Sequence, residues 1–434
     1  MRSGSPRSAA AVLAVVAIVL AGCSSSGSDK GSGTAPSAGG ALPTLTPGAN
    51  PGITDTTVTV GQVDELSAPV QGMFQGAKVG VQAYFNYIND QGGVNGRKLV
   101  LDAQDTQFNA GTLVAKARQI AVNDFAFVGS YSLLDSALAP ILDSTGTPFV
   151  GAPISQQLVR NKNVYTTWAP PLDQIPTGAF EYFAKKYPDE VKKVGIIYGS
   201  AGAALWEPIK AAAESAGWHF VYSRAYGANE TNFLPDAIKM KSAGVKLVYS
   251  FGSGSAVATA QFLKATQQAN FRPIQVQSEN YFTTLSKLAG AAAEGVYFPL
   301  TYALFAGEDA TAVPSVALLD KWVKSTDASY TAYSGDLVWG WASAMLFVEA
   351  LKAAGPSPTR ASLAAALRQQ TSFGADGLLP ASNVGNNTAS GCWLLATMTD
   401  GKYRRVDPSP TNGFICSPNG MYQVPGAPAS TSRG

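Results

Sequence analysis

The sequence predicts an α/β protein made of two lobes, each built on a doubly wound parallel sheet. Strand-like β-branched runs alternate with amphipathic helical runs along most of the chain, with polar loops after the strands. About 380 residues remain after an N-terminal export signal and the tether that follows it, which is too many for one ordinary domain. A proline-bounded extended segment, Thr166–Pro171, separates two series of such units.

The first strand–helix–strand unit sets the pattern. Thr57–Val63 is an alternating β-branched run, as expected for a strand. Val81, Phe85 and Ile88 then share one helical face, and Lys98–Ala103 is the next strand. A glycine-rich turn between them ends the helix. The unit therefore predicts a right-handed crossover between two parallel strands.

The same alternation continues through both series. The first series adds helices at Thr112–Val122 and about Asp135–Asp143 and strands at Ala126–Gly129 and Pro148–Gly151. The second series has strands Val194–Tyr198, His219–Tyr222, Leu247–Phe251 and Ile274–Gln277 and helices Gln174–Lys186, Trp206–Ala216, Phe233–Ala243 and Ala256–Gln268. Later elements are a crossing at Val296–Leu300, helices Gly335–Ala353 and Arg360–Gln369, a third crossing near Gly374–Leu379, and a hairpin of Gly391–Thr397 with Lys402–Val406.

The N-terminus carries an export signal. Arg2 and Arg7 precede an apolar run, Ala9–Leu20, that is too short to span a bilayer. The run ends in Leu20-Ala-Gly-Cys23, which matches the bacterial lipobox, so we expect Cys23 to carry lipid after cleavage. An ordinary signal peptide with an incidental cysteine is the alternative. With lipid attached, the protein would be extracytoplasmic, anchored to the outer face of the cell membrane as a lipoprotein.

Composition excludes several classes of function. The net charge is +2 and 14% of the residues are charged, so there is no nucleic-acid footprint. His219 is the single histidine, which excludes a histidine-rich metal site, and we expect neither a metal nor a cofactor. Cys392 and Cys416 are the cysteines left beside Cys23. In an exported protein they are expected to form a disulfide, with two free buried thiols as the alternative.

Two stretches resemble a known family. Asn89–Leu99, followed by Gln104-Asp105, and the downstream Ala291–Tyr297 resemble bacterial solute-binding proteins of the branched-chain amino acid (Leu/Ile/Val) type, which serve ABC importers. The resemblance implies a type I periplasmic binding protein, a Venus-flytrap clamp whose two lobes are joined by a three-crossover hinge. It also implies a monomer that closes over a small-molecule ligand and docks on an ABC permease.

The resemblance and the composition together divide the chain. The expected segments are a signal peptide at 1–22, a disordered tether at 23–54, lobe 1 at 55–170 plus 301–376, lobe 2 at 171–300 plus 377–424, and a loose tail at 425–434.

The ligand clamp of the family's amino-acid binders is altered here. Leu133 stands where the resemblance implies the serine that takes the ligand carboxylate. One loop later, Ser155 falls where the resemblance implies a helping threonine, for which its hydroxyl is a substitute. Glu279 falls close to the family's ammonium-binding acid. Because an unpaired charge is costly to desolvate, we predict that the ligand is not a simple aliphatic amino acid.

The candidate binding residues come from the loops after the strands, where ligands lie in doubly wound sheets. They are Gln71, Phe74, Tyr131, Ser132, Ser155, Trp206, Phe251, Ser253, Glu279 and Tyr281, with Asn280 and Phe282 beside them. Their aromatic and amide character suits a larger or more apolar solute with a few polar handles.

The expected function is that of an extracytoplasmic solute-binding component of an ABC import system, not an enzyme. A ligand-sensing receptor that signals to a membrane kinase would use the same clamp. An extracellular hydrolase is a third possibility, and a Ser-His-Asp triad there would have to use His219.

Overall fold

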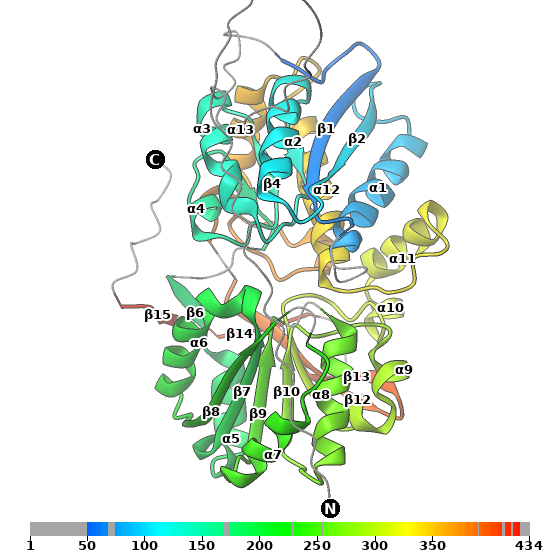
Figure 1. Cartoon of the computed structure of the whole chain (residues 1–434). Coiled ribbons are helices and arrows are strands. Elements are labelled where there is room, and N and C mark those ends of the chain that lie inside the picture. The colour runs from blue at the N-terminus through cyan, green and yellow to red at the C-terminus, as the bar shows by residue number, and fades with distance from the viewer. Residues whose placement is uncertain are drawn as a thin grey trace, which may run out of the picture. The chain divides into compact units, whose positions relative to one another are not determined.

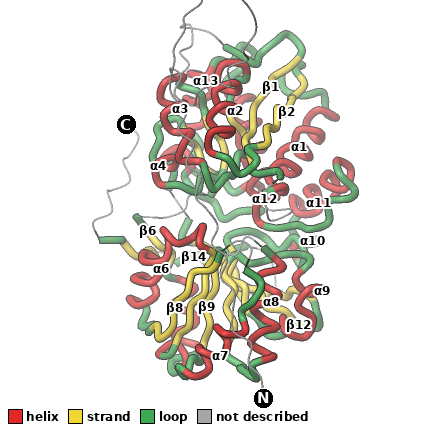
Figure 2. Tube along the Cα trace, viewed as in Figure 1, coloured by secondary structure: helices red, strands yellow, loops and turns green. Residues whose placement is uncertain are grey.

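The computed structural model describes residues 50–67, 74–168, 173–227, 230–252, 255–388, 390–409, 413–417 and 420–425. Within these residues the chain forms one large sheet of five strands and another of eight, each flanked by helices (Figures 1 and 2). We call the first sheet with its helices lobe 1 and the second sheet with its helices lobe 2. The predicted architecture of two α/β lobes with parallel sheets is confirmed.

The sheet of lobe 1 has the strand order β2-β1-β3-β4-β5, and all neighbouring strands are parallel. Its strands are β1 (Thr57–Asp64), β2 (Lys98–Asp105), β3 (Phe127–Val128), β4 (Phe149–Gly151) and β5 (Val164–Thr166). The helices between them are α1 (Gln75–Asp90), α2 (Ala110–Asn123), α3 (Ala139–Thr145) and α4 (Gln156–Val159). The helices α11 (Pro314–Thr326), α12 (Gly335–Ala353) and α13 (Arg360–Arg368) join this lobe later in the chain.

Both faces of the lobe 1 sheet are buried, because successive strand residues point to opposite sides. Val128 and Val150 pack in the apolar cluster that holds α1 and α12. Phe127 and Phe149 pack in the cluster that holds α2 and α3 on the other face. The short strands are therefore apolar throughout, as expected for a covered parallel sheet.

The sheet of lobe 2 has the strand order β13-β12-β11-β10-β9-β7-β8, with β14 paired to β12. Its strands are β7 (Val194–Gly199), β8 (Phe220–Tyr226), β9 (Leu247–Phe251), β10 (Ile274–Ser278), β11 (Tyr297–Leu300), β12 (Cys392–Thr399), β13 (Lys402–Asp407) and β14 (Ile415–Cys416). The strands β7 to β11 run parallel, whereas β12 is antiparallel to its neighbours.

The helices of lobe 2 also cover both faces of its sheet. The apolar cluster of α5 (Gly178–Lys186) and α6 (Ala203–Ser215) includes Ile196 of β7. Ile197, the next residue, belongs to the cluster of α7 (Leu234–Ser242) and α8 (Ala256–Gln268) on the other side. The helices α9 (Leu285–Ala289) and α10 (Asp309–Ala312) follow β10 and β11 along the chain.

Two details differ from the sequence-based expectation. The helix expected from Gln174 begins at Gly178, because Gln174–Pro176 is instead a strand, β6, paired with β15 (Met421–Gln423). The third crossing lies later than Gly374–Leu379, because the Asn387 side chain still binds lobe 1, donating to the carbonyl oxygen of Val164 at 2.9 Å. A polar loop held by side-chain hydrogen bonds leaves no periodic pattern that would have placed this crossing.

The helices α1 and α12 lie side by side in lobe 1 and approach each other unusually closely (Figure 1). A Cβ atom on Gly80 would lie 2.3 Å from the carbonyl oxygen of Leu337, and one on Gly340 would lie 2.1 Å from that of Ala77. Only glycine fits at such a backbone contact. The helix α12 is buried along nearly its whole length, and this packing fixes where its N-terminus lies.

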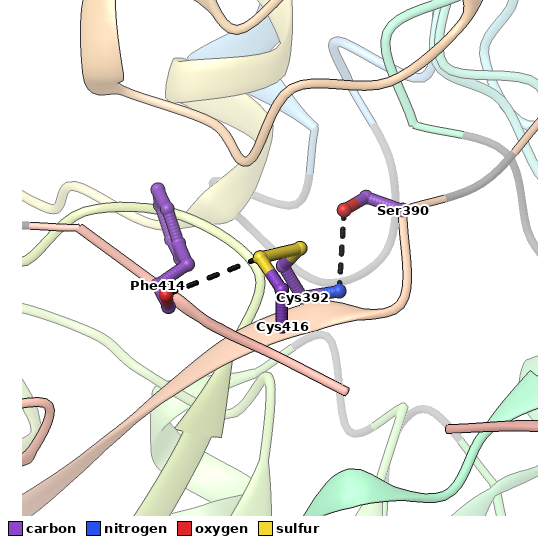
Figure 3. Close-up of a disulfide and its surroundings, with 4 residues drawn as sticks. All are labelled: Ser390, Cys392, Phe414 and Cys416. Carbon is purple, nitrogen blue, oxygen red and sulfur yellow. Dashed lines mark hydrogen bonds between the residues drawn. A yellow bond between two sulfur atoms is a disulfide. The ribbon is translucent and has the colours of Figure 1, made fainter. Parts of the chain in front are cut away.

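The two remaining cysteines are joined. The Sγ atoms of Cys392 and Cys416 are 2.07 Å apart, and the bond links β12 to β14 (Figure 3). The Cys392 N–H also donates to Ser390 Oγ at 3.2 Å. Of the two alternatives for these residues, the structure has the disulfide.

Replacing Gly340 by alanine tests the contact between α1 and α12. The added methyl group should force the helices apart and lower the free energy of unfolding by about 1–3 kcal/mol, a typical cost of overpacking. The variant Gly111→Ala is the control, because a Cβ there meets only Asn109 Oδ1, at 3.2 Å. Urea unfolding of both variants measures the difference, and equal stabilities would show that the close approach is not needed.

Candidate functional site

A cavity of about 290 Å³ lies between the lobes, at the carboxyl end of the lobe 2 sheet. One water molecule occupies ~30 Å³ in the liquid, so this volume corresponds to on the order of ten water molecules. Its lining residues come from both lobes and from the crossings: Phe74, Tyr131, Trp168, Ile175, Pro176, Ala179, Phe180, Leu205, Ile209, Tyr249, Phe251, Gly252, Ser278, Glu279, Asn280, Phe282, Pro299, Leu300, Thr301, Ser334, Gly335, Asp336, Trp339 and Trp393.

The topology explains why these residues meet. The parallel strands β9, β10 and β11 end at one edge of the sheet, which places Phe251, Ser278 and Leu300 together. From the opposite side, the N-terminus of α12 brings Asp336 and Trp339 to the same space.

The lobe 1 side of the cavity is a continuous aromatic surface. The rings of Trp168 and Trp339 are stacked with centroids 4.6 Å apart, and Tyr131 contacts Trp339 edge-on at 5.2 Å. Phe74 in turn contacts Tyr131 at 4.7 Å. Such stacked and edge-to-face contacts stabilise the arrangement of the rings.

Glu279 is the acidic group on the lobe 2 side. Its Oε1 accepts hydrogen bonds from the N–H and the Oγ1 of Thr301, both at 3.0 Å. Its Oε2 accepts none from the residues that the structure describes. Burial raises the pKa of Glu279 to about 7, because a desolvated carboxylate is disfavoured, and the bonds from Thr301 oppose this shift only in part.

Asp336 is the acidic group on the lobe 1 side. Its Oδ2 accepts the N–H of Gly76, at the start of α1, at 2.9 Å. Ser334 donates its hydroxyl hydrogen to Oδ1. Burial raises the pKa of this carboxyl above its usual range, and the bonds from Ser334 and Gly76 lower it in part. The α1 helix has no cap from its own N-cap side chain, so Asp336 supplies one from another helix.

The lining offers little for catalysis or metal binding. It contains no histidine or cysteine, so it offers neither a Ser-His pair nor a thiolate nucleophile. In the described part of the chain, no group of three or more His, Cys, Asp or Glu side chains could hold a metal ion. The arrangement suits binding of an apolar solute with one or two polar groups.

Several residues predicted from the sequence line the cavity. Phe74, Tyr131, Phe251 and Glu279 do so, and so do their neighbours Asn280 and Phe282. The candidates Gln71 and Ser253 and the lipidation residue Cys23 lie outside the described residues.

Ser132 and Ser155 do not line the cavity, although both were candidates. The Ser132 hydroxyl donates to Glu65 and accepts the N–H of Leu134 at 3.0 Å. The Ser155 hydroxyl accepts the N–H of Leu158 at 3.3 Å and caps α4. Both hydroxyls therefore serve the local backbone, as short polar side chains often do in loops.

Trp206 and Tyr281 are also outside the lining. The Trp206 ring packs in the lobe 2 core, 5.6 Å from Tyr198 between centroids. The Tyr281 ring is fully buried against Tyr403, at 4.2 Å, and its hydroxyl accepts the N–H of Ala306 at 2.7 Å. These two aromatic residues are core residues.

Sequence reasoning missed much of the lining. Trp168 belongs to the segment expected to separate the two series, and Trp393 belongs to a strand of the expected hairpin. Tyr249 lies in the middle of an expected strand and not in a loop after it. Asp336 and Trp339 lie in a helix whose apolar residues run all around it, so no face could be assigned. An acidic residue in the first turn of that helix was the one available signal.

Comparison with known families gives one match that covers most of the chain. The model of the family described as "Periplasmic binding protein" matches residues 57–402. The Leu/Ile/Val-binding protein homolog 3 of Brucella melitensis is 28% identical over 204 residues, which are 45% of this chain and 54% of that protein. BraC3 of Rhizobium johnstonii, a Leu/Ile/Val-binding protein, is 26% identical with the same coverage, 45% and 54%. The chain thus spans about half the length of the curated relatives it matches.

Solved structures share the fold. A fatty acid ABC transporter substrate-binding protein from Thermomonospora curvata superposes with a TM-score of 0.71 at 18% identity, over 87% of this chain and 97% of that one. A branched-chain amino acid ABC transporter protein from Thermus thermophilus with bound valine gives 0.71 at 17% identity, over 84% and 98%. At these identities the likeness shows the fold alone.

The raised pKa of Glu279 predicts how stability depends on pH. The folded protein holds this proton up to a pKa of about 7, whereas an unfolded glutamate loses it near 4.5. Between these values the folded state binds more protons, so this group makes stability fall as pH rises, by up to about 1.4 kcal/mol per pH unit. Glu279→Gln should remove that loss, so that the variant's free energy of unfolding declines less steeply between pH 5 and 7.

Urea unfolding at four pH values from 5 to 8 measures both slopes. Glu207→Gln, at an exposed position on α6, is the matched control and should keep the slope of the parent protein. Parallel slopes for the Glu279→Gln variant and the parent would contradict the prediction.

Proposed function

This chain belongs to the periplasmic binding protein family, and we propose that it is the extracytoplasmic solute-binding component of an ABC import system. It would capture a small organic solute with a large aromatic or apolar surface between its lobes and deliver it to a membrane permease. The permease would dock on the rims of both lobes, where it can sense that the lobes have closed.

The observation that carries the proposal is the cavity between the lobes. Both lobes contribute aromatic groups to it, such as Trp339 from α12 and Phe251 from β9. A solute that contacts both sides favours the closed arrangement over any open one, because only the closed form makes both sets of contacts. Binding would thus be converted into a change of shape that a permease can recognise.

The geometry gives less support to a hydrolase. His219, the residue that a catalytic triad would require, is exposed beside the amino end of β8. Its backbone N–H donates to the carbonyl oxygen of Val191 at 2.8 Å, and its side chain does not line the cavity. We therefore propose that the protein binds its solute without changing it chemically.

The apolar character of the lining supports the sequence-based prediction about the ligand. An aliphatic amino acid needs a partner for its carboxylate, and the hydroxyl of Ser155, the substitute offered by the sequence, caps α4 instead. A larger solute with an aromatic or alicyclic body gains more from the stacked rings of Trp168 and Trp339.

We also propose that the protein is a lipoprotein held at the membrane through Cys23. The lipobox Leu20-Ala-Gly-Cys23 supports this, and residues 24–49, rich in serine, glycine, proline and alanine, would serve as the tether. Gly52 already belongs to lobe 1, because its carbonyl oxygen accepts the N–H of Thr59 at 2.7 Å. No helix in the described ranges has the length and apolar character that crossing a bilayer requires.

A thermal-shift screen of the full-length protein, reconstituted in lipid nanodiscs, tests the solute-binding proposal. Aromatic or alicyclic solutes should raise the melting temperature, whereas leucine, isoleucine and valine should not. A ligand at about 100 times its Kd adds roughly 2.7 kcal/mol of stability, which such a screen detects.

Trp339→Ala and Phe251→Ala should each weaken binding of the best solute at least about tenfold, because each removes a large ring from the lining. Phe108→Ala is the control, since Phe108 is 41% exposed and lies outside the cavity. A shift with the aliphatic amino acids, or equal affinities in all three variants, would contradict the proposal.

Labelling of cells with palmitate tests the lipid anchor. The parent protein should incorporate label and fractionate with the membrane, and Cys23→Ser should do neither. Cys392→Ser, which removes a different cysteine, should still be labelled. Label on the Cys23→Ser variant would contradict the proposal, because the lipid would then be attached at another residue.

A further inference from the structure

Two carboxyl groups line the cavity without a basic partner among the described residues. Glu279 and Asp336 line it from opposite lobes, and no lysine, arginine or histidine lines it. The neighbouring sequences 68–73, 169–172 and 253–254 contain no basic residue either. Lys78 of α1 is exposed and does not line the cavity. Buried carboxylates are ordinarily paired with a cation, so this site lacks one.

Among the described residues, no cationic side chain is bonded to either carboxylate. Glu279 is bonded by Thr301 and keeps Oε2 without a hydrogen bond from the described residues. Asp336 is bonded by Gly76 and Ser334, which are neutral donors. Both groups can accept a further bond or a nearby positive charge.

Asp336 also prevents the site from binding an acid. The first N–H groups of α1 would attract an anionic ligand group, because they lack partners within the helix. The carboxylate of Asp336 occupies this position by accepting the N–H of Gly76. A ligand carboxylate would therefore meet no basic side chain and would lie near two acidic ones.

The aromatic walls favour a cation as well. The faces of Trp168, Trp339 and Tyr131 carry the negative side of the ring quadrupole, which attracts an ammonium group within about 6 Å. This attraction strengthens as water is excluded from around the charge.

We propose that the ligand is an apolar organic cation: a protonated amine or quaternary ammonium on an aromatic or alicyclic body, without a carboxylate. Its charge lies between Glu279 and Asp336, and its body lies against the aromatic walls. This inference rests on the proposed function, because it names the class of solute that the same cavity captures. A bound cation also stabilises the ionised form of both carboxyl groups, which burial alone disfavours.

Calorimetric titration of the full-length protein in nanodiscs with matched probes tests the inference. Tryptamine, tryptophol, tryptophan and indole-3-propionate share one indole body and differ in the head group, which is cationic, neutral, zwitterionic or anionic. Phenyl and cyclohexyl series with the same head groups extend the range of sizes. In the best-fitting series the amine should bind at least about tenfold tighter than the neutral alcohol and about a hundredfold tighter than the acid.

Two variants separate charge from structure. Glu279→Gln and Asp336→Asn should each weaken binding of the amine at least about tenfold more than binding of the neutral alcohol. Because Asp336 also caps α1, urea unfolding checks that each variant is folded. Glu207→Gln, at an exposed position, should leave the affinities of all probes unchanged.

The outcomes are distinct. Tighter binding of an acid, a zwitterion or a neutral probe than of its amine, with loss of that binding in Trp339→Ala, overturns the cation inference and leaves the solute-binding function standing. Equal amine affinities in the parent, Glu279→Gln and Asp336→Asn proteins also overturn the inference. Absence of binding by every probe of every series overturns the inference and the proposed function together.

Discussion

The backbone contact between α1 and α12 is the constraint on which the site depends. Gly80 and Gly340 let the two helices approach so closely that neither position has room for a Cβ atom. The contact fixes the N-terminus of α12 beside that of α1, which brings Asp336 onto the Gly76 N–H. It also places Trp339 against Trp168. A shift of one helix along the other would move the acidic group and the aromatic wall together, since both belong to α12.

The protein treats its buried acids in two ways. In lobe 2, Asp309 and Arg405 form an ion pair in which both side chains are almost fully buried, at 1% and 2% exposure. Arg405 supplies the positive charge that balances Asp309, and the ion pair joins α10 to β13. Glu279 and Asp336 have neutral donors instead, and burial raises the pKa of each. Carboxyl groups with raised pKa values gathered in a cavity are typical of functional sites, because a ligand can supply the partner that the protein lacks.

A residue's place in the cavity lining could be predicted where it followed from strand order. Phe251 and Glu279 come directly after strands of a parallel sheet, whose carboxyl ends share an edge, and both line the cavity. Ser155 and Tyr281 stand in equally suitable loops but do not line the cavity. A loop position does not reveal which way a side chain points. The Ser155 hydroxyl accepts a backbone N–H of its own loop, and the Tyr281 hydroxyl accepts the N–H of Ala306.

By itself the sequence determined the two-lobe α/β fold and the strand edge at which the cavity lies, because these depend on local periodicity and on chain order. The export signal stays a prediction from the sequence. The tertiary structure alone decided that Asp336 caps α1 from another helix, that Trp168 stacks on Trp339, and that no basic side chain lines the cavity. These facts join residues far apart in the chain. They depend on how closely two helices pack, and no local pattern records that distance.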